Sequence, residues 1–231
     1  MSNSYFQFRQ FTVHQERCAM KVGTDGTLLG AWAAGGKMIL DIGTGTGLIA
    51  MMMAQRFPES TVVGIDIDDD AINQAKENVA GSPFGGRIRI EKTDVQSFYH
   101  CEKFDSIVSN PPYFVNSLTC PDSQRTLARH NGTLSYSQLF TSVTRLLSDN
   151  GIFSLIIPFD CKPRLDSEAF MHGFFAIESV AVRTTETKPA RRYLLSFARS
   201  QINPYRQSEI IISDTEYDRL LEPFYLKKQK K

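Results

Sequence analysis

The chain has 231 residues, of which 42% are hydrophobic and 22% charged, a composition typical of a globular protein large enough to form a core without disulfide or metal staples. It contains no run of about 18 apolar residues, so the sequence predicts no membrane-spanning segment. The four cysteines are far apart and show no CxxC or Cys/His spacing, which predicts reduced thiols and no zinc site. With no secretory signal visible, we expect a cytoplasmic protein.

The net charge of +1 conceals an uneven distribution of charge along the chain. Residues 1–40 carry four Lys or Arg against two Asp or Glu, and residues 160–231 carry thirteen against ten. Residues 41–159 between them carry nine against thirteen. An acidic centre between basic ends is typical of a small-molecule site whose flanking segments meet a polyanion, although ordinary surface charge would give the same numbers.

The first predicted elements are a short helix and a strand that runs into a glycine loop. Thr24 or Asp25 is a suitable N-cap for a helix extending to about residue 34, where two glycines end it. Residues 38–42 form an apolar strand, and the loop Gly43-Thr44-Gly45-Thr46-Gly47 leads from it into a helix that begins at Leu48. Glycines in such a loop let a ligand approach the backbone closely, and the following helix N-terminus favours polar or anionic groups.

Each of the next three predicted strands ends at, or is followed closely by, a polar residue that could bind a ligand. The strand 61–66 ends at Asp66, 19 positions after Gly47, and Asp68 caps the helix that follows to residue 79. The strand 88–92 is followed by Asp94. The strand 104–109 runs into Asn110-Pro111-Pro112-Tyr113. Because parallel strands end at one edge of a sheet, we expect these groups to meet there.

The second half of the chain continues the alternation of helices and strands. A long polar segment to residue 134 contains Arg125 and Arg129, and a capping box at 135–138 opens a helix to about residue 147. Beyond it we predict a strand at 151–158, a helix at 165–172, strands at 176–183 and 193–199, and a last short helix after residues 213–216. Arg191 and Arg192 lie in the polar connection between the last two strands.

This order of elements predicts an α/β protein with a Rossmann-like, doubly wound, seven-stranded and mostly parallel sheet. The two closing strands have no helix between them, which predicts an antiparallel hairpin at one edge. We interpret residues 1–231 as one domain. It comprises an N-terminal extension (1–37) that contributes to the cofactor and substrate site, a catalytic core (38–200) and a C-terminal extension (201–231) with a basic tail.

The spacing of the glycines and the acid before them distinguish a dinucleotide from a cofactor with a cationic amino-acid moiety. The spacing Gly43-x-Gly45-x-Gly47 differs from the G-x-G-x-x-G of dinucleotide-binding proteins. An acid at Asp41 suits a cationic amino-acid moiety better than a pyrophosphate. Asp66 is placed to bind a ribose diol, and Asp94 to bind an adenine amino group. Together these residues suit S-adenosylmethionine.

The segment Asn110-Pro111-Pro112-Tyr113 is suited to hold a planar group that carries an NH2. The Asn110 side-chain oxygen and the Pro111 carbonyl are two acceptors for the two amine hydrogens, Pro112 stiffens the backbone, and Tyr113 offers a stacking surface. Two acceptors draw the amine nitrogen toward sp3 geometry and release its lone pair. Neither a metal nor a covalent nucleophile is needed. Adenine N6, guanine N2 and the glutamine side chain all present a planar NH2, so the residues alone leave the amine open.

The stretch Leu40–Gly47, Asp66, Asp94 and Asn110–Tyr113 resembles class I S-adenosylmethionine-dependent methyltransferases of the amino-methylating subgroup. Lys21–Trp32, the aromatic residues of Phe6–Phe11 and Asn110–Phe114 resemble the bacterial tRNA1(Val) (adenine-37-N6)-methyltransferases, and this resemblance runs from about Phe6 to Phe197.

That resemblance implies methyl transfer to the N6 amine of adenine 37 in a valine tRNA, with no membrane association and no obligate protein partner visible. The RNA-binding candidates are Arg125, Arg129, Arg191 and Arg192. The catalytic candidates are Asn110, Pro111, Pro112 and Tyr113. The cofactor-binding candidates are Lys21, Thr24, Asp25, Asp41, Gly43, Thr44, Gly45, Gly47, Asp66, Ile67, Asp94, Val95 and Asn110.

Four alternatives stay open from the sequence. Guanine N2 methylation uses the same motif. A protein-glutamine methyltransferase usually carries a separate helical substrate domain, for which about 37 residues before the first strand of the core leave no room. An NAD-dependent oxidoreductase disagrees with the glycine spacing and with the lack of a hydride-transfer constellation. A non-catalytic RNA-binding module would not need every cofactor position.

Overall fold

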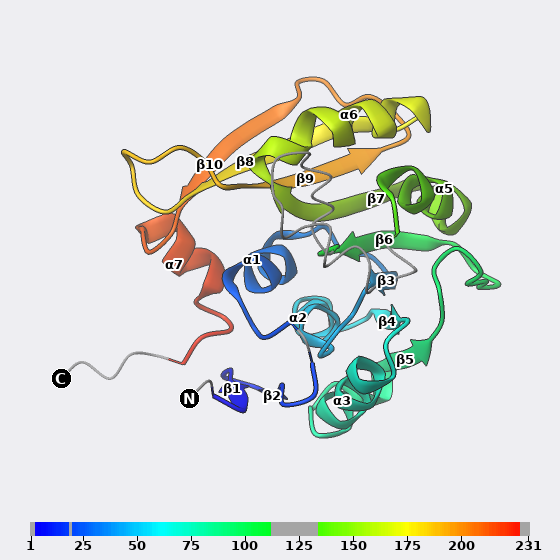
Figure 1. The fold of residues 1–231 in the computed structure, drawn as a ribbon, viewed down its shortest axis with the longest axis vertical. Coiled ribbons are helices and arrows are strands. Elements are labelled where there is room, and N and C mark those ends of the chain that lie inside the picture. The colour runs from blue at the N-terminus through cyan, green and yellow to red at the C-terminus, as the bar shows by residue number, and fades with distance from the viewer. Residues whose placement is uncertain (1–2, 19, 112–133, 227–231) are drawn as a thin grey trace, which may run out of the picture.

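The structure, a computed structural model, describes residues 3–18, 20–111 and 134–226. In these residues, eight strands form a central sheet with the order β10-β8-β9-β7-β6-β3-β4-β5 (Figure 1). The strands are β3 (Met38–Ile42), β4 (Thr61–Asp66), β5 (Ile88–Lys92), β6 (Phe104–Ser109), β7 (Leu147–Pro158), β8 (Phe175–Arg183), β9 (Arg192–Ala198) and β10 (Arg206–Ile211). The strands from β7 to β5 in this order are parallel, and β9 alone is antiparallel to its neighbours.

Helices cover both faces of the sheet. The described helices are α1 (Thr24–Trp32), α2 (Leu48–Arg56), α3 (Asp69–Ala80), α5 (Tyr136–Leu146), α6 (Lys162–Met171) and α7 (Thr215–Leu221), with short 3-10 turns at Gly85–Arg87 and Phe159–Cys161. The core on one face contains buried residues of α1, α2, α3 and α7, and the core on the other contains those of α5 and α6. This is the predicted α/β, doubly wound class.

The central strands are mostly apolar because both of their faces are buried. In β3, Ile39 packs in the core beneath α1 and α2, whereas Leu40 and Ile42 pack in the core beneath α5. Successive side chains of a strand point to opposite faces, so a strand between two helical layers needs apolar residues at both phases. This explains why β3 is apolar at both phases except at Asp41.

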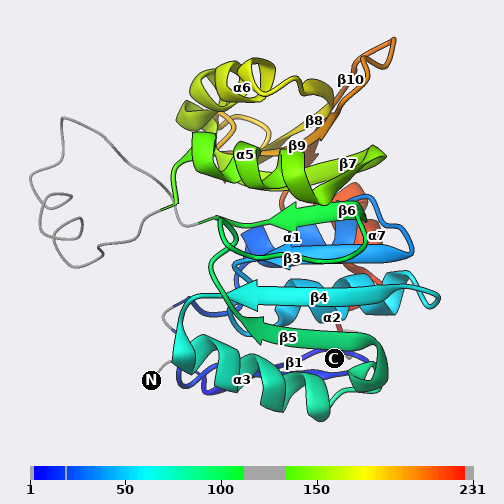
Figure 2. The same ribbon diagram turned by 90° about the vertical axis from the view of Figure 1, so that its right-hand side faces the viewer.

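The order of the strands creates a switch point between β3 and β6. The chain passes from β3 to β4 and β5 on one side, and then returns to place β6 on the other side of β3. Figure 2 shows the arrowheads of β4, β5 and β6 pointing toward the same edge. In open α/β sheets, ligands bind at the carboxyl ends of the strands beside such a switch.

The predicted strand count of seven is wrong, because β10 adds an eighth strand parallel to β8. Four of its six residues are exposed, so it carries no alternating apolar pattern that would reveal a strand. Its position is supported by the cross-strand ion pairs Arg206–Glu178 (2.9 Å) and Arg183–Glu209 (3.2 Å). The predicted antiparallel hairpin of β8 and β9 is present, but β10 pairs with the outer side of β8, so β10 and not the hairpin forms the edge of the sheet.

Of the predicted helix ends, those of α1 are wrong and the N-caps of α3 and α5 are confirmed. The N-cap of α1 is Gly23 instead of Thr24 or Asp25, and the helix stops at Trp32, with Ala33 as its C-cap, before the two glycines. The predicted capping box at Ser135 is confirmed, with Ser135 and Gln138 exchanging side-chain and backbone hydrogen bonds. Asp68 caps α3 as predicted by accepting a hydrogen bond from the Ala71 amide at 2.8 Å.

The two terminal segments meet beside α1. A short ribbon of β1 (Tyr5–Gln7) and β2 (Thr12–His14) lies near the C-terminal end of the described chain (Figure 1). The Arg9 amide donates to the Phe224 carbonyl at 2.8 Å, and the Arg9 side chain donates to the Tyr225 carbonyl at 2.6 Å. Of the helices that the structure describes, none is both long and apolar enough to cross a membrane.

Candidate functional site

The glycine loop, Asp66 and Asn110 come together at the carboxyl edge of the sheet. Residues Ile42 of β3 and Ser109 of β6 are paired neighbours, and the Ser109 hydroxyl donates to the Ile42 carbonyl at 2.9 Å. The amides of Gly43 and Thr44 both donate to the Ile65 carbonyl of β4, at 2.9 and 3.0 Å. The loop that follows β3 is therefore tied to the ends of both neighbouring strands.

Gly43, Gly45 and Gly47 are required by the backbone of this loop. Their φ angles are 73°, 54° and 80°, in the left-handed region that side-chain-bearing residues rarely adopt. A Cβ built on Gly43 would meet no described atom within 4 Å, so the need for glycine there comes from backbone conformation and not from crowding. Gly47 is also the N-cap of α2 and gives its first turn no side-chain hydrogen bond. This leaves a backbone surface that a ligand can approach closely.

Asp41 is fully buried beneath the loop. Its Oδ2 accepts hydrogen bonds from the Thr44 hydroxyl at 2.7 Å and from the Ala50 amide at 3.2 Å. Burial raises its pKa to about 7, against the opposing effect of these two hydrogen bonds. Its Oδ1 is buried and has no hydrogen-bond partner among the described residues. An unpaired carboxylate oxygen under a glycine loop fits the cationic amino-acid end of S-adenosylmethionine and would repel a pyrophosphate.

Asp66 braces the loop from the end of β4. Its Oδ2 accepts from the Gly45 amide at 2.9 Å, and its Oδ1 accepts from the Asp68 amide at 3.1 Å. A carboxylate has about four acceptor sites, so both oxygens retain capacity for a ribose diol. The next residue, Ile67, is 58% exposed, so its side chain is available to contact a flat base beside Asp66.

Asp94 and Val95 follow β5 and differ in exposure. Asp94 is exposed, and its Oδ1 accepts from the Gln96 amide at 2.9 Å in a local turn. The side chain of Val95 is buried in the core beside α5, so only its backbone can reach a ligand.

Arg145 of α5 donates to the Val95 carbonyl at 2.8 Å and also donates to the carbonyls of Gln96 and Phe98. Sequence reasoning missed Arg145, because no local pattern marks a helix residue that supports a loop about 50 positions earlier.

Asn110 lies directly after β6, beside the end of β3. Its Oδ1 is buried, with no hydrogen-bond partner in the described part of the chain. Buried amide oxygens are nearly always paired, so an unpaired one calls for an explanation such as a missing substrate. Pro111 is buried next to it. Pro112 and Tyr113, together with Arg125 and Arg129, lie outside the described residues.

The Lys21–Asp25 segment is anchored on both sides. The Gln15 side chain, 5% exposed, accepts from the Val22 amide at 2.7 Å. Asp25 forms an ion pair with Arg192, with 2.8 Å between Oδ2 and Nε. Lys21 is exposed, and Thr24 is half-buried with its carbonyl accepting from the Thr27 hydroxyl at 3.1 Å. Of the two described arginines predicted to bind RNA, Arg191 is exposed, whereas Arg192 is half-buried against Asp25.

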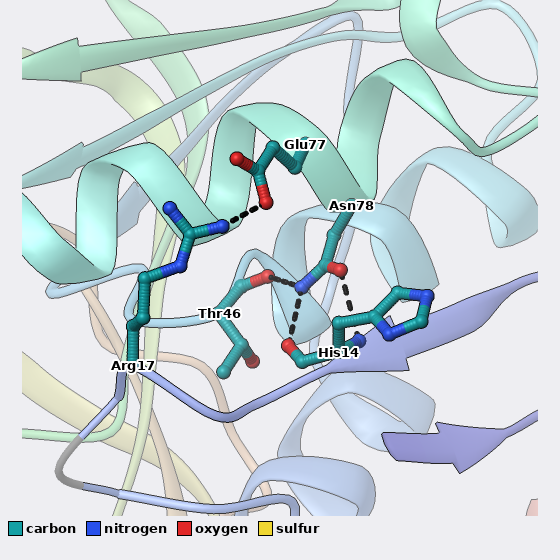
Figure 3. A network of polar contacts seen from close by, with 5 residues as sticks. All are labelled: His14, Arg17, Thr46, Glu77 and Asn78. Carbon is teal, nitrogen blue, oxygen red and sulfur yellow. Dashed lines mark hydrogen bonds and ion pairs between the residues drawn. The ribbon is translucent and has the colours of Figure 1, made fainter. Parts of the chain in front are cut away.

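Asn78 of α3 is a second residue that sequence reasoning missed. Its side chain is 3% exposed and connects the N-terminal ribbon to the glycine loop, as Figure 3 shows. The Asn78 Oδ1 accepts from the His14 amide at 2.9 Å, and Nδ2 donates to the carbonyls of His14 at 2.8 Å and Thr46 at 2.9 Å. An asparagine on the face of an amphipathic helix reads as an ordinary surface residue until the partner segment is known.

Comparisons with known proteins agree with this geometry. Residues 26–157 match the family model described as the methyltransferase small domain. A protein of Bacteroides thetaiotaomicron named tRNA1(Val) (adenine(37)-N6)-methyltransferase is 50% identical over 200 residues, covering 85% of this chain and 84% of that protein. A protein of the same name from Yersinia enterocolitica is 41% identical over 96% of this chain and 92% of its own length.

Solved structures support the fold. A predicted O-methyltransferase from Agrobacterium tumefaciens superimposes with a TM-score of 0.68 at 17% identity, over 87% of this chain and 96% of that chain. A glycopeptide N-methyltransferase solved with S-adenosylmethionine gives a TM-score of 0.56 at 13% identity, over 78% and 89%. The fold, the extent of the family match and the identity to full-length relatives together show that this chain belongs to the methyltransferase small-domain family and, within it, to the tRNA1(Val) (adenine(37)-N6)-methyltransferases.

Proposed function

We propose that this protein transfers the methyl group of S-adenosylmethionine to the N6 amine of adenine 37 in tRNA1(Val), and that Asn110 is the residue that holds this amine. The observation that carries the proposal is the buried, unpaired Oδ1 of Asn110 at the end of β6, in the described part of the chain. The names of the relatives supply the nucleotide and the tRNA.

S-adenosylmethionine supplies an electrophilic methyl group on a sulfonium. Asp41 would hold its cationic amino-acid end, the Gly43–Gly47 loop would let it lie against the backbone, and Asp66 would accept hydrogen bonds from its ribose hydroxyls. Two of these assignments are supported by free acceptor capacity, on the unpaired Oδ1 of Asp41 and in the remaining lone pairs of Asp66, and the third by the glycines of the loop. Ile67 and Asp94 would lie at its adenine end.

The adenine amine is a poor nucleophile because its lone pair is delocalised into the ring. In our proposal, Asn110 Oδ1 accepts one amine hydrogen and the Pro111 carbonyl accepts the other, which localises the lone pair on nitrogen. The buried position of Asn110 Oδ1 strengthens this hydrogen bond by excluding water. Positioning of this kind accounts for most of the rate in a direct displacement. Stacking of the base on Tyr113 stays a prediction, as do phosphate contacts from Arg125 and Arg129.

The target base has to leave its stack to enter the site, which costs little in a single-stranded loop. The uneven charge of the chain fits RNA contacts by local basic patches, since the net charge is only +1. A cytoplasmic location belongs to the same proposal, because a tRNA substrate requires it.

The experiment that tests the proposed function is methyl transfer from labelled cofactor to total RNA and, in parallel, to total protein. We expect label in tRNA and N6-methyladenosine as the modified nucleoside. N2-methylguanosine would assign the enzyme to the guanine alternative, and label in protein would assign it to the glutamine alternative. A tRNA1(Val) transcript with guanine at position 37 should accept no methyl group.

A further inference from the structure

Arg192 and Asp25 form an ion pair between segments that are far apart in the sequence. The Arg192 Nε donates to Asp25 Oδ2 at 2.8 Å across 167 positions of chain. The two side chains retain 30% and 24% of their exposure, so the pair is substantially withdrawn from water. A charge-assisted hydrogen bond in such an environment is stronger than a surface pair.

The backbone on the arginine side of the pair is held firmly. Arg192 opens β9 and is paired with Pro158 of β7 on one side and Val182 of β8 on the other. The preceding amide, that of Arg191, donates to the Val182 carbonyl at 2.8 Å, and the Arg191 carbonyl accepts from the Phe159 amide at 3.0 Å. The backbone that carries the Arg192 side chain is therefore held by the strands on both sides of β9.

The aspartate side of the pair lies near the start of α2. Asp25 is in the first turn of α1, where the helix dipole favours its negative charge. The next residue, Gly26, faces α2 so closely that a Cβ there would lie 3.2 Å from the Leu48 side chain. Leu48 is the first residue of α2 and follows Gly47 directly. Asp25 is thus one residue from a direct contact with the helix that begins at the glycine loop.

We propose that Arg192 is a positioning residue for the cofactor site: it holds Asp25, and through Asp25 the Lys21–Asp25 segment, against the glycine loop. In this proposal the Asp25 carboxylate offsets the positive charge of Arg192, which makes Arg192 a weaker phosphate contact than the exposed Arg191. Of the two neighbouring arginines, Arg191 is the one that contacts the RNA backbone. This inference rests on the proposed function for the identity of the cofactor and the RNA.

The two neighbouring arginines give a matched comparison. Titration calorimetry with S-adenosylmethionine measures the cofactor Kd of wild type, Arg192→Ala, Arg192→Lys, Asp25→Asn, the double variant Asp25→Asn/Arg192→Ala, and Arg191→Ala. We expect Arg192→Ala to raise this Kd by about tenfold, equivalent to ~1.4 kcal/mol. Arg192→Lys should recover part of the loss. The double variant should bind no more weakly than Asp25→Asn alone, because Arg192 acts through Asp25.

RNA kinetics at saturating cofactor supply the other half of the test. Arg191→Ala should leave the cofactor Kd unchanged, raise the KM for tRNA and reduce the slope of log affinity against log salt by about one. Arg192→Ala should leave that slope unchanged. The inference is overturned by an unchanged cofactor Kd in Arg192→Ala, by additive effects of Asp25 and Arg192, or by a reduced salt slope in Arg192→Ala. If the methyl acceptor is not this tRNA, the cofactor titrations still decide the role of Arg192.

Discussion

Replacement of Asn78 by alanine tests how the N-terminal ribbon and the cofactor loop are joined. The substitution removes three hydrogen bonds, which connect Asn78 to the His14 amide, the His14 carbonyl and the Thr46 carbonyl at 2.8–2.9 Å. The Asn78 side chain is 3% exposed, so water cannot replace the bond to Thr46 without entering the core. His14 itself is exposed, so its two backbone groups can be partly rehydrated.

The expected cost follows from this geometry. A buried polar group that loses its hydrogen-bond partner lowers the free energy of unfolding by about 1–3 kcal/mol, and a group that water can reach lowers it by less. With the Thr46 carbonyl counted in full and the two His14 groups in part, Asn78→Ala should lower the free energy of unfolding by about 3 kcal/mol. Because Thr46 belongs to the glycine loop, the cofactor Kd should also rise.

Urea denaturation and cofactor calorimetry measure both effects, and the preceding residue supplies the control. Glu77 carries an exposed ion pair with Arg17, seen beside Asn78 in Figure 3. Solvent screens such a pair, so Glu77→Ala should leave stability and cofactor affinity nearly unchanged. Equal stability losses for the two variants would refute the reasoning, because they would show that the buried amide does not join the ribbon to the loop.

Three further predictions concern the carboxylates of Asp41 and Asp66. Burial raises the pKa of Asp41 to about 7, and a bound cation would lower it, so cofactor affinity should rise with pH from about 5.5 to 7.5. Calorimetry should show this slope in wild type and its loss in Asp41→Asn; a Kd independent of pH in wild type would contradict the assignment. Since the folded-state pKa of Asp41 exceeds that of the unfolded chain, this residue should also reduce stability as pH rises from about 4 to about 7, which denaturation of wild type and Asp41→Asn can measure. Asp66→Ala removes the acceptor of the Gly45 amide and should raise the cofactor Kd by at least about tenfold, whereas an unchanged Kd would remove the ribose assignment.

The order of the elements and their polar ends could be predicted from the sequence because each rests on local chemistry. Gly43, Gly45 and Gly47 mark the loop in the sequence, and in the structure all three have positive φ angles. The strands around them end at one edge because strands joined by crossover connections run parallel. Asp66 and Asn110 are placed at that edge by strand order alone.

The missed features depend on contacts between distant segments. β10 is a strand because β8 offers it an edge, while its own sequence is mostly exposed. Asn78 and Arg145 matter because of the carbonyls they reach, 32 or more residues away. Arg192 looked equivalent to Arg191 in the sequence, and only the fold separates an exposed arginine from one paired with Asp25.

The central claim is that Asn110 holds the amine, and that its contribution to cofactor binding, which the sequence also predicts, is small. The most direct measurement is the single-turnover rate of N6-methyladenosine formation at position 37 of a tRNA1(Val) transcript, at saturating cofactor, for wild type and Asn110→Ala. We predict a fall of about a hundredfold or more in this rate, with the cofactor Kd within about twofold of wild type. A rate close to that of wild type, or a cofactor Kd that rises as far as the rate falls, would contradict the account.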